Sequence, residues 1–105
     1  MQHQALANGR WFELTLSEQL GNIGSEVGRA AKWQHKNEER FWSAVTRALE
    51  LIDLTLQDKR WEKRMPEITR IKEVFADAVL GGKHYGSNLD SLEKYFMQFA
   101  MVARK

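Results

Sequence analysis

The residues of this chain whose types and spacing could do chemistry begin with Arg29 and His35, which lie close together in the sequence. A guanidinium can stabilise the negative charge that develops on a phosphate during bond cleavage, and an imidazole can transfer a proton near neutral pH. Arg29 and His35 are therefore candidate catalytic residues for phosphate chemistry.

The same pair matches a family pattern. Its spacing resembles the Arg-x4-6-His signature of HEPN ribonucleases, which are small helical-bundle enzymes. In that family the pair lies at a dimer seam and acts on the 2′-hydroxyl and the scissile phosphate of RNA. Ala30 follows the arginine here, whereas the family commonly has a polar residue there. The resemblance implies a ribonuclease or a toxin–antitoxin component as one alternative function.

Basic and aromatic residues alternate between positions 58 and 65, and basic residues recur near both ends of the chain. This group consists of Lys59, Arg60, Trp61, Lys63 and Arg64, with Arg10, Trp11, Arg104 and Lys105. In an antiparallel bundle these segments meet at one pole. Cations interleaved with exposed tryptophan suit a phosphate backbone and unstacked bases, so we expect the pole to bind nucleic acid. The alternative is a solvated pole whose cations complement the helix dipoles.

Metal and cofactor chemistry finds little support in the sequence. His35 and His84 are expected at the opposite pole, but two histidines without carboxylate or thiol ligands make a weak metal site. The Glu-x-x-His pairs of a di-iron bundle are absent, and Glu50 and Asp53 are expected to form salt bridges. The chain has no cysteine, which excludes zinc-thiolate sites and cysteine nucleophiles. We expect no metal and no cofactor.

Composition predicts one ordinary globular domain. The chain has 105 residues, is 43% hydrophobic and 29% charged, and has a formal net charge of +2. That charge is too small to predict nucleic-acid binding by itself. No apolar run is long enough for a signal peptide or a membrane span, so we expect a cytoplasmic protein without membrane association. Residues 1–10 are expected to form a disordered tail, followed by one domain over 11–105.

Hydrophobic periodicity predicts four helices and no strands. The first begins with a capping box at Thr15 and Glu18 and runs to about residue 34. The second is capped by Asn37 and runs from about 38 to 57. The third begins at Pro66 and ends at the Gly81-Gly82 pair, and the fourth is capped by Asn88 or Asp90. Short connections make neighbours antiparallel, so we expect an all-α, up-down-up-down four-helix bundle.

The first helix contains three glycines, each of which costs about 0.8–1 kcal/mol relative to alanine. Gly21, Gly24 and Gly28 share one stripe with Ser17 and Ala31. A stripe of small residues permits close approach of another helix. Small residues of the second helix, Ala44 and Ala48, are the first candidates to fill it. The alternative is that a helix of another subunit fills the stripe.

Several runs resemble a group of small prokaryotic helical proteins without an established activity. These runs are EQLGNIGSEVGRAAKW, RALELIDLTL, KHYGS and LEKYFMQFA, and the resemblance extends from Phe12 to Arg104. The size and helix plan are more distantly similar to the 23S-intervening-sequence proteins and to the accessory variability proteins of retroelements. Those families form ring-like homo-oligomers that bind nucleic acid through basic surfaces, although fold does not determine function.

The leading functional hypothesis is a non-enzymatic accessory protein that self-associates and binds RNA, DNA or a protein partner. Self-association is expected because the aromatic residues exceed what a small core can bury. The residues considered for this excess are Trp33, Trp42, Trp61, Phe96 and Phe99. The alternatives are the ribonuclease that uses Arg29 and His35, and a purely structural protein-interaction module.

Overall fold

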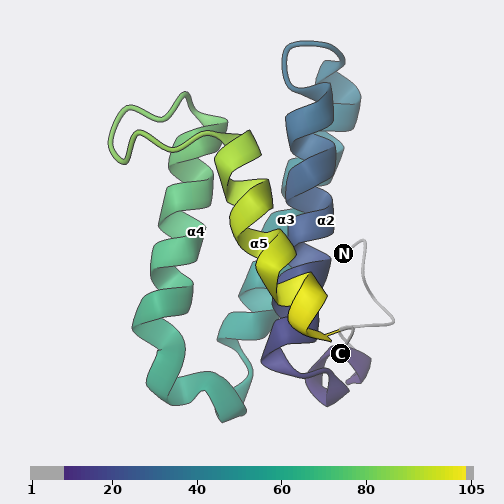
Figure 1. Cartoon of the computed structure of the whole chain (residues 1–105), viewed down its shortest axis with the longest axis vertical. Helices are drawn as coiled ribbons and strands as arrows, with labels where there is room; N and C mark the ends of the chain where they lie inside the picture. Colours follow the sequence, from purple (N-terminus) through teal and green to yellow (C-terminus); the bar gives the residue numbers. More distant parts are fainter. Residues whose placement is uncertain (1–8, 104–105) are drawn as a thin grey trace.

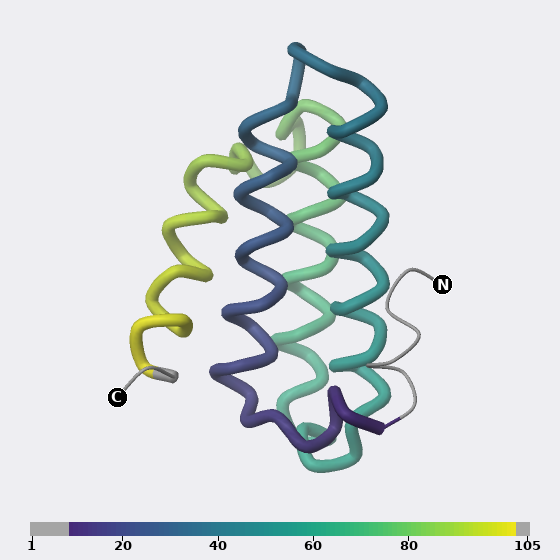
Figure 2. Tube along the Cα trace, turned by 90° about the vertical axis from the view of Figure 1, so that its right-hand side faces the viewer, coloured from purple at the N-terminus to yellow at the C-terminus, as the bar shows by residue number. Residues whose placement is uncertain are grey.

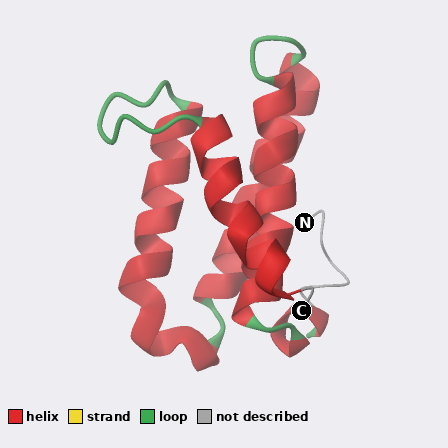
Figure 3. Ribbon diagram, viewed as in Figure 1, coloured by secondary structure: helices red, strands yellow, loops and turns green. Residues whose placement is uncertain are grey.

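The computed structural model describes residues 9–103, and in this range the chain is helical with no strand (Figures 1 and 3). The α-helices are α2 (Leu16–Trp33), α3 (Glu38–Leu56), α4 (Met65–Val79) and α5 (Leu89–Ala103), and the 3-10 helices are η1 (Arg10–Glu13) and η2 (Lys59–Arg64). Successive α-helices reverse direction, which confirms the predicted up-down-up-down bundle (Figure 1). No described helix is long and apolar enough to cross a membrane.

The helix ends follow their capping residues. Thr15 and Glu18 form the predicted capping box, in which the Glu18 amide donates to Thr15 Oγ1 at 3.1 Å and the Thr15 amide donates to Glu18 Oε1 at 2.9 Å. Asn37 accepts a hydrogen bond from a backbone amide in the first turn of α3, and Asn88 does the same for α5. Asn88, and not Asp90, is therefore the cap of the last helix.

The core is formed by residues of all four α-helices and of η1. Within it α2 contacts both α3 and α5, and Figure 2 shows the course of α2 between these two helices. Its largest fully buried side chains are Trp11, Phe75 and Phe96. Trp11 comes from η1, which the sequence did not predict, and its indole nitrogen donates to Thr55 Oγ1 at 3.2 Å. The expectation that Trp11 lies exposed at the basic pole was wrong.

The glycine stripe of α2 faces α5. A Cβ atom added at Gly21 would lie 3.1 Å from the Cα atom of Ala100, and one added at Gly24 would overlap the Cβ atom of Phe96. The expectation that Ala44 and Ala48 fill the stripe was therefore wrong, because both are buried in the core from α3 while α5 lies closest to the glycines. The occupant is a helix of the same chain.

Ala31, at the end of the stripe, is half-buried against the core. Because α5 packs closely on α2, most of α5 lies away from α4. Contact between α4 and α5 is small, and α5 starts beside the end of α4 but then crosses toward the start of α2 (Figure 1). The two helices therefore diverge from the loop that joins them.

The loop between α4 and α5 is anchored to the end of α4. The carboxylate of Asp77 accepts hydrogen bonds from the backbone amides of His84 at 3.1 Å and Tyr85 at 2.9 Å. Gly81 and Gly82 both have positive φ angles, which allow the chain to leave α4 as their sequence predicted.

Candidate anion-binding face between α2 and α3

A shallow pocket of about 240 Å³ lies on the seam between α2 and α3. It is lined by Arg29 and Trp33 of α2 and by Glu39, Arg40, Ser43, Ala44 and Arg47 of α3. Helical spacing brings these residues together, because positions three or four apart lie on one helix face. The three guanidinium groups outnumber the two nearby carboxylates, Glu39 in the lining and Glu26 paired with Arg29, so the pocket favours an anion.

Two cations lie over the ring of Trp33. The ammonium of Lys32 lies 5.2 Å from the ring centre, and the guanidinium carbon of Arg40 lies 4.7 Å from it. Both distances suit cation–π attraction, which holds long flexible side chains in place. The indole is itself half-buried against the core. Lys32 and Arg40 are thus positioned by a fixed aromatic group and remain exposed to a ligand.

A buried carboxylate lies behind the arginines of this pocket. Glu26 of α2 has a side chain that is only 7% exposed, and its Oε1 atom accepts a hydrogen bond from Arg29 Nη1 at 2.7 Å. Its other oxygen lies 3.9 Å from Arg47 Nη1 and, within residues 9–103, accepts no hydrogen bond. A buried carboxylate restricts the guanidinium groups beside it, so Glu26 holds Arg29 through the short hydrogen bond and attracts Arg47.

At the predicted basic pole, the side chains of Arg60, Trp61 and Arg64 make contacts within the protein. Arg60 Nη2 donates to Asp58 Oδ2 at 2.7 Å and to the backbone oxygen of Leu14 at 2.6 Å. Its guanidinium carbon lies 4.5 Å from the Trp61 ring centre. The hydrogen bond from Arg60 lowers the pKa of Asp58 below its usual range, against the opposing effect of burial.

Trp61 is half-buried, and its indole nitrogen donates to Gln19 Oε1 at 2.9 Å. Arg64 forms a forked ion pair with Glu67, with distances of 3.0–3.2 Å. Among the pole cations that the structure describes, Arg10, Lys59 and Lys63 form no ion pair with a described residue. Arg104 lies outside the described residues. Nucleic-acid binding at the pole therefore stays a prediction that rests mainly on Arg10 and two lysines.

Arg29 and His35 line two different pockets. Arg29 faces the α2–α3 seam, where it is paired with Glu26. His35 follows the end of α2 with a φ angle of 63° and lines a different pocket with Trp42 and Val79. Among the described residues, no side-chain contact joins Arg29 to His35, so the structure gives no support to a joint role in which the arginine stabilises charge and the histidine transfers a proton.

The other titratable candidates are not gathered into a metal site. Within residues 9–103, no three histidine or acidic side chains form a group that could hold a metal ion. His35 and His84 are both exposed. Asp53 makes the salt bridge expected of it, accepting from Lys72 Nζ of α4 at 2.7 Å.

Comparison with protein-family models, with curated proteins and with solved structures finds no match to this chain. What the fold establishes is a small all-helical protein with four α-helices in its described part. The comparisons assign the chain to no family.

Proposed function

We propose that this protein is a non-enzymatic helical-bundle accessory protein that binds single-stranded nucleic acid across the α2–α3 seam. The observation that carries the proposal is the convergence of Arg29, Arg40 and Arg47 on one pocket beside Trp33. Guanidinium groups make forked hydrogen bonds to phosphate and are weakly hydrated, which favours phosphate contacts.

An extended polyanion fits this surface better than an isolated phosphate. Arg40 and Arg47 are two helical turns apart on α3, about 10 Å at about 1.5 Å per residue. Lys32, next to Trp33 on α2, adds an exposed cation at one end of the pocket. A row of cations of this length can follow successive phosphates of a single strand.

Self-association stays part of the proposal, although fewer aromatic side chains are exposed than the sequence predicted. Of the five aromatic residues expected in excess, Trp42 is exposed at 47%, whereas Phe96 is fully buried and the others are half-buried. The exposed apolar residues near the end of α5 are Met97, Met101 and Val102. The distant architectural resemblance to ring-forming, nucleic-acid-binding helical proteins points in the same direction, as an analogy only.

The experiment is a fluorescence anisotropy titration of labelled single-stranded RNA and DNA oligonucleotides at several salt concentrations. Contacts to three phosphates predict a slope of about −2 for log affinity against log salt. The double variant Lys32→Glu, Arg40→Glu should weaken binding by more than about tenfold. The matched control, Lys59→Glu with Lys63→Glu, makes the same charge change at the basic pole and should have a much smaller effect.

Each alternative predicts a different result. A larger loss in the pole variant would move the site to the predicted basic pole. Absence of binding at low salt would reject the proposal and leave the protein-interaction module. Cleavage of the RNA would favour the ribonuclease, and cleavage that persists in His35→Ala would exclude a catalytic role for that histidine.

A further inference from the structure

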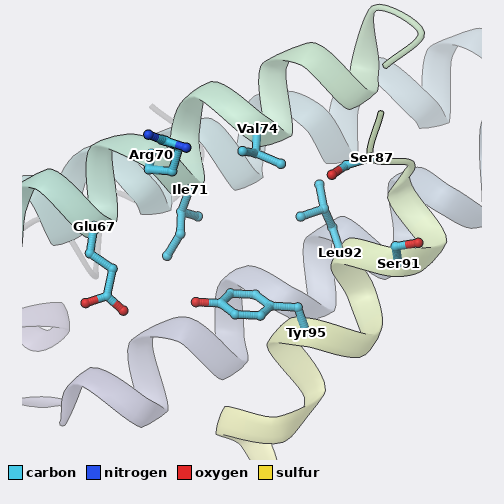
Figure 4. Close-up of a pocket in the computed structure, with 8 residues that line it drawn as sticks. All are labelled: Glu67, Arg70, Ile71, Val74, Ser87, Ser91, Leu92 and Tyr95. Carbon is cyan, nitrogen blue, oxygen red and sulfur yellow. The ribbon is translucent and has the colours of Figure 1, made fainter. Parts of the chain in front are cut away.

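A second surface lies between α4 and α5, where the two helices diverge. It is a groove of about 410 Å³, and Figure 4 shows Ile71 of α4 and Leu92 and Tyr95 of α5 pointing into the gap between the two helices, with Arg70 at its edge. Ile71 and Val74 of α4 form one apolar wall, and Leu92 and the ring of Tyr95 of α5 form the other. The groove exists because α5 packs onto the glycine face of α2 instead of onto α4.

The charges at the edge of this groove leave one cation unbalanced. Glu67 lies at one end, but its carboxylate is already paired with Arg64. Arg70, also on the edge, has no carboxylate partner among the described residues, and its guanidinium carbon lies 5.6 Å from the ring centre of Tyr85. Hydroxyl groups of Ser87 and Ser91 line the other end. The polar groups of the groove therefore suit an anion.

Tyr95 adds an unused hydrogen-bond donor. Within residues 9–103 its hydroxyl has no hydrogen-bond partner, although its ring is fixed by edge contacts to Phe96 and Phe99, with centres 5.4 and 5.3 Å apart. Burial, with a smaller contribution from the charge of Glu67, raises the pKa of Tyr95. The phenol therefore stays protonated at neutral pH and can donate to a ligand.

The size of the groove indicates a small molecule. From Glu67 to Val74 the groove follows two turns of α4, a length of about 10 Å at about 1.5 Å per residue. Its volume falls in the range of about 300–1,000 Å³ that is typical of small-molecule sites, which are mostly apolar with a few fixed polar groups.

We propose that this groove binds a small organic carboxylate, with the carboxylate paired to Arg70 and the apolar body lying between Ile71 and Leu92. The hydroxyl of Tyr95 donates a further hydrogen bond to the ligand. Burial of the apolar body supplies the affinity, and the unbalanced guanidinium selects the charge.

The test is an amide NMR titration with decanoate, decanol and decylamine, three probes with the same chain length and different charge. Decanoate should bind at least about tenfold more tightly than either neutral decanol or cationic decylamine. The largest shifts should lie at residues 71–74 and 91–95. Equal binding of the three probes, no binding of decanoate below its micelle concentration, or shifts confined to other regions would each overturn the proposal.

Variants test the assigned roles. Arg70→Gln should weaken decanoate binding about tenfold and reduce the preference over decylamine, whereas Lys94→Gln removes an equal charge from exposed α5 and should change little. Tyr95→Phe should weaken decanoate binding by a few-fold with unchanged charge preference. An Arg70→Gln protein that binds decanoate like the parent would contradict the role of the guanidinium.

Discussion

The Cβ atom of Phe96 on α5 occupies the place where a side chain on Gly24 of α2 would have to lie. Phe96 is fully buried, so it cannot move aside without disturbing the core. Gly28 differs, because a Cβ atom there would meet the carboxylate of Glu93, the end of a flexible side chain. The absence of a side chain therefore matters more at Gly24 than at Gly28.

Gly24→Ala should lower the free energy of unfolding by about 1–3 kcal/mol, because overpacking against Phe96 outweighs the better helix propensity of alanine. Gly28→Ala should be neutral or stabilise by up to about 1 kcal/mol, because Glu93 can swing into solvent. Urea unfolding followed by circular dichroism measures both variants. Equal effects of the two substitutions would show that α5 does not pack on α2 in this register.

Gln19 connects three segments at the start of α2. Its Nε2 atom donates to the backbone oxygen of Trp11 and to Asp58 Oδ2, both at 3.0 Å, and its Oε1 atom accepts from Trp61. Gln19→Met keeps the volume but removes a donor from the buried Trp11 carbonyl, one of two donors from Asp58 Oδ2 and the acceptor of the Trp61 indole, so it should destabilise the protein by about 2–4 kcal/mol. Chemical denaturation gives the value, and Gln98→Met on the exposed side of α5 is the matched control.

Gln19→Met should also alter the environment of Trp61, whose indole nitrogen loses its acceptor. The indole N–H resonance of Trp61 should shift in an NMR spectrum, while that of Trp42, exposed on α3, should not. A variant as stable as the parent with an unchanged Trp61 resonance would contradict the network.

Stability should fall in acid because of Asp58. Its folded-state pKa is lowered, chiefly by the hydrogen bond from Arg60, and the unfolded value is about 3.9. A lowered folded-state pKa contributes stability that is fully present above the unfolded pKa and is lost as the pH falls through the folded pKa. The free energy of unfolding should therefore decrease as the pH is lowered below about 4.

Asp77 adds to the same acid sensitivity, since the backbone amides of Tyr85 and His84 lower its pKa. Asp58→Asn should reduce stability at neutral pH and make the decline below about pH 4 shallower. Denaturation at a series of pH values tests this, with Asp90→Asn as a control for the loss of one exposed carboxylate. An unaltered pH profile in Asp58→Asn would rule out the assigned linkage.

The fold could be predicted because its determinants are local. Thr15 with Glu18, Asn37 and the Gly81-Gly82 pair each mark a helix end through contacts within a few residues. The 3.6-residue periodicity then identifies the buried faces. The short helix η2 was missed because its polar composition has no apolar period, and Asp58, which caps it, is a weak signal when read alone.

The partner of the glycine stripe and the exposure of the tryptophans depend on contacts between distant segments. Gly24 meets Phe96 and Trp11 meets Thr55 only after the chain has folded, so periodicity within one helix could not identify either pair. The α2–α3 pocket could have been predicted from the sequence more easily than these contacts. Arg40 and Arg47 lie on one face of α3, two turns apart, and this spacing could have marked a basic seam.

The role of Glu26 leads to a prediction that separates orientation from net charge. If Glu26 orients Arg29 and Arg47, Glu26→Gln should weaken oligonucleotide binding about three- to tenfold although it removes a negative charge. Coulombic attraction alone predicts the reverse. Glu39→Gln is the matched control, because Glu39 lines the same pocket and is exposed, so its removal should strengthen binding modestly.

Anisotropy titrations at one fixed salt concentration compare the parent with both variants, and thermal melts establish that each is folded. Opposite changes in affinity for Glu26→Gln and Glu39→Gln would indicate that a buried carboxylate holds the guanidinium groups in a binding geometry. Stronger binding in both variants would show instead that Glu26 acts only through its charge, because the arginines would then reach the phosphates without its support.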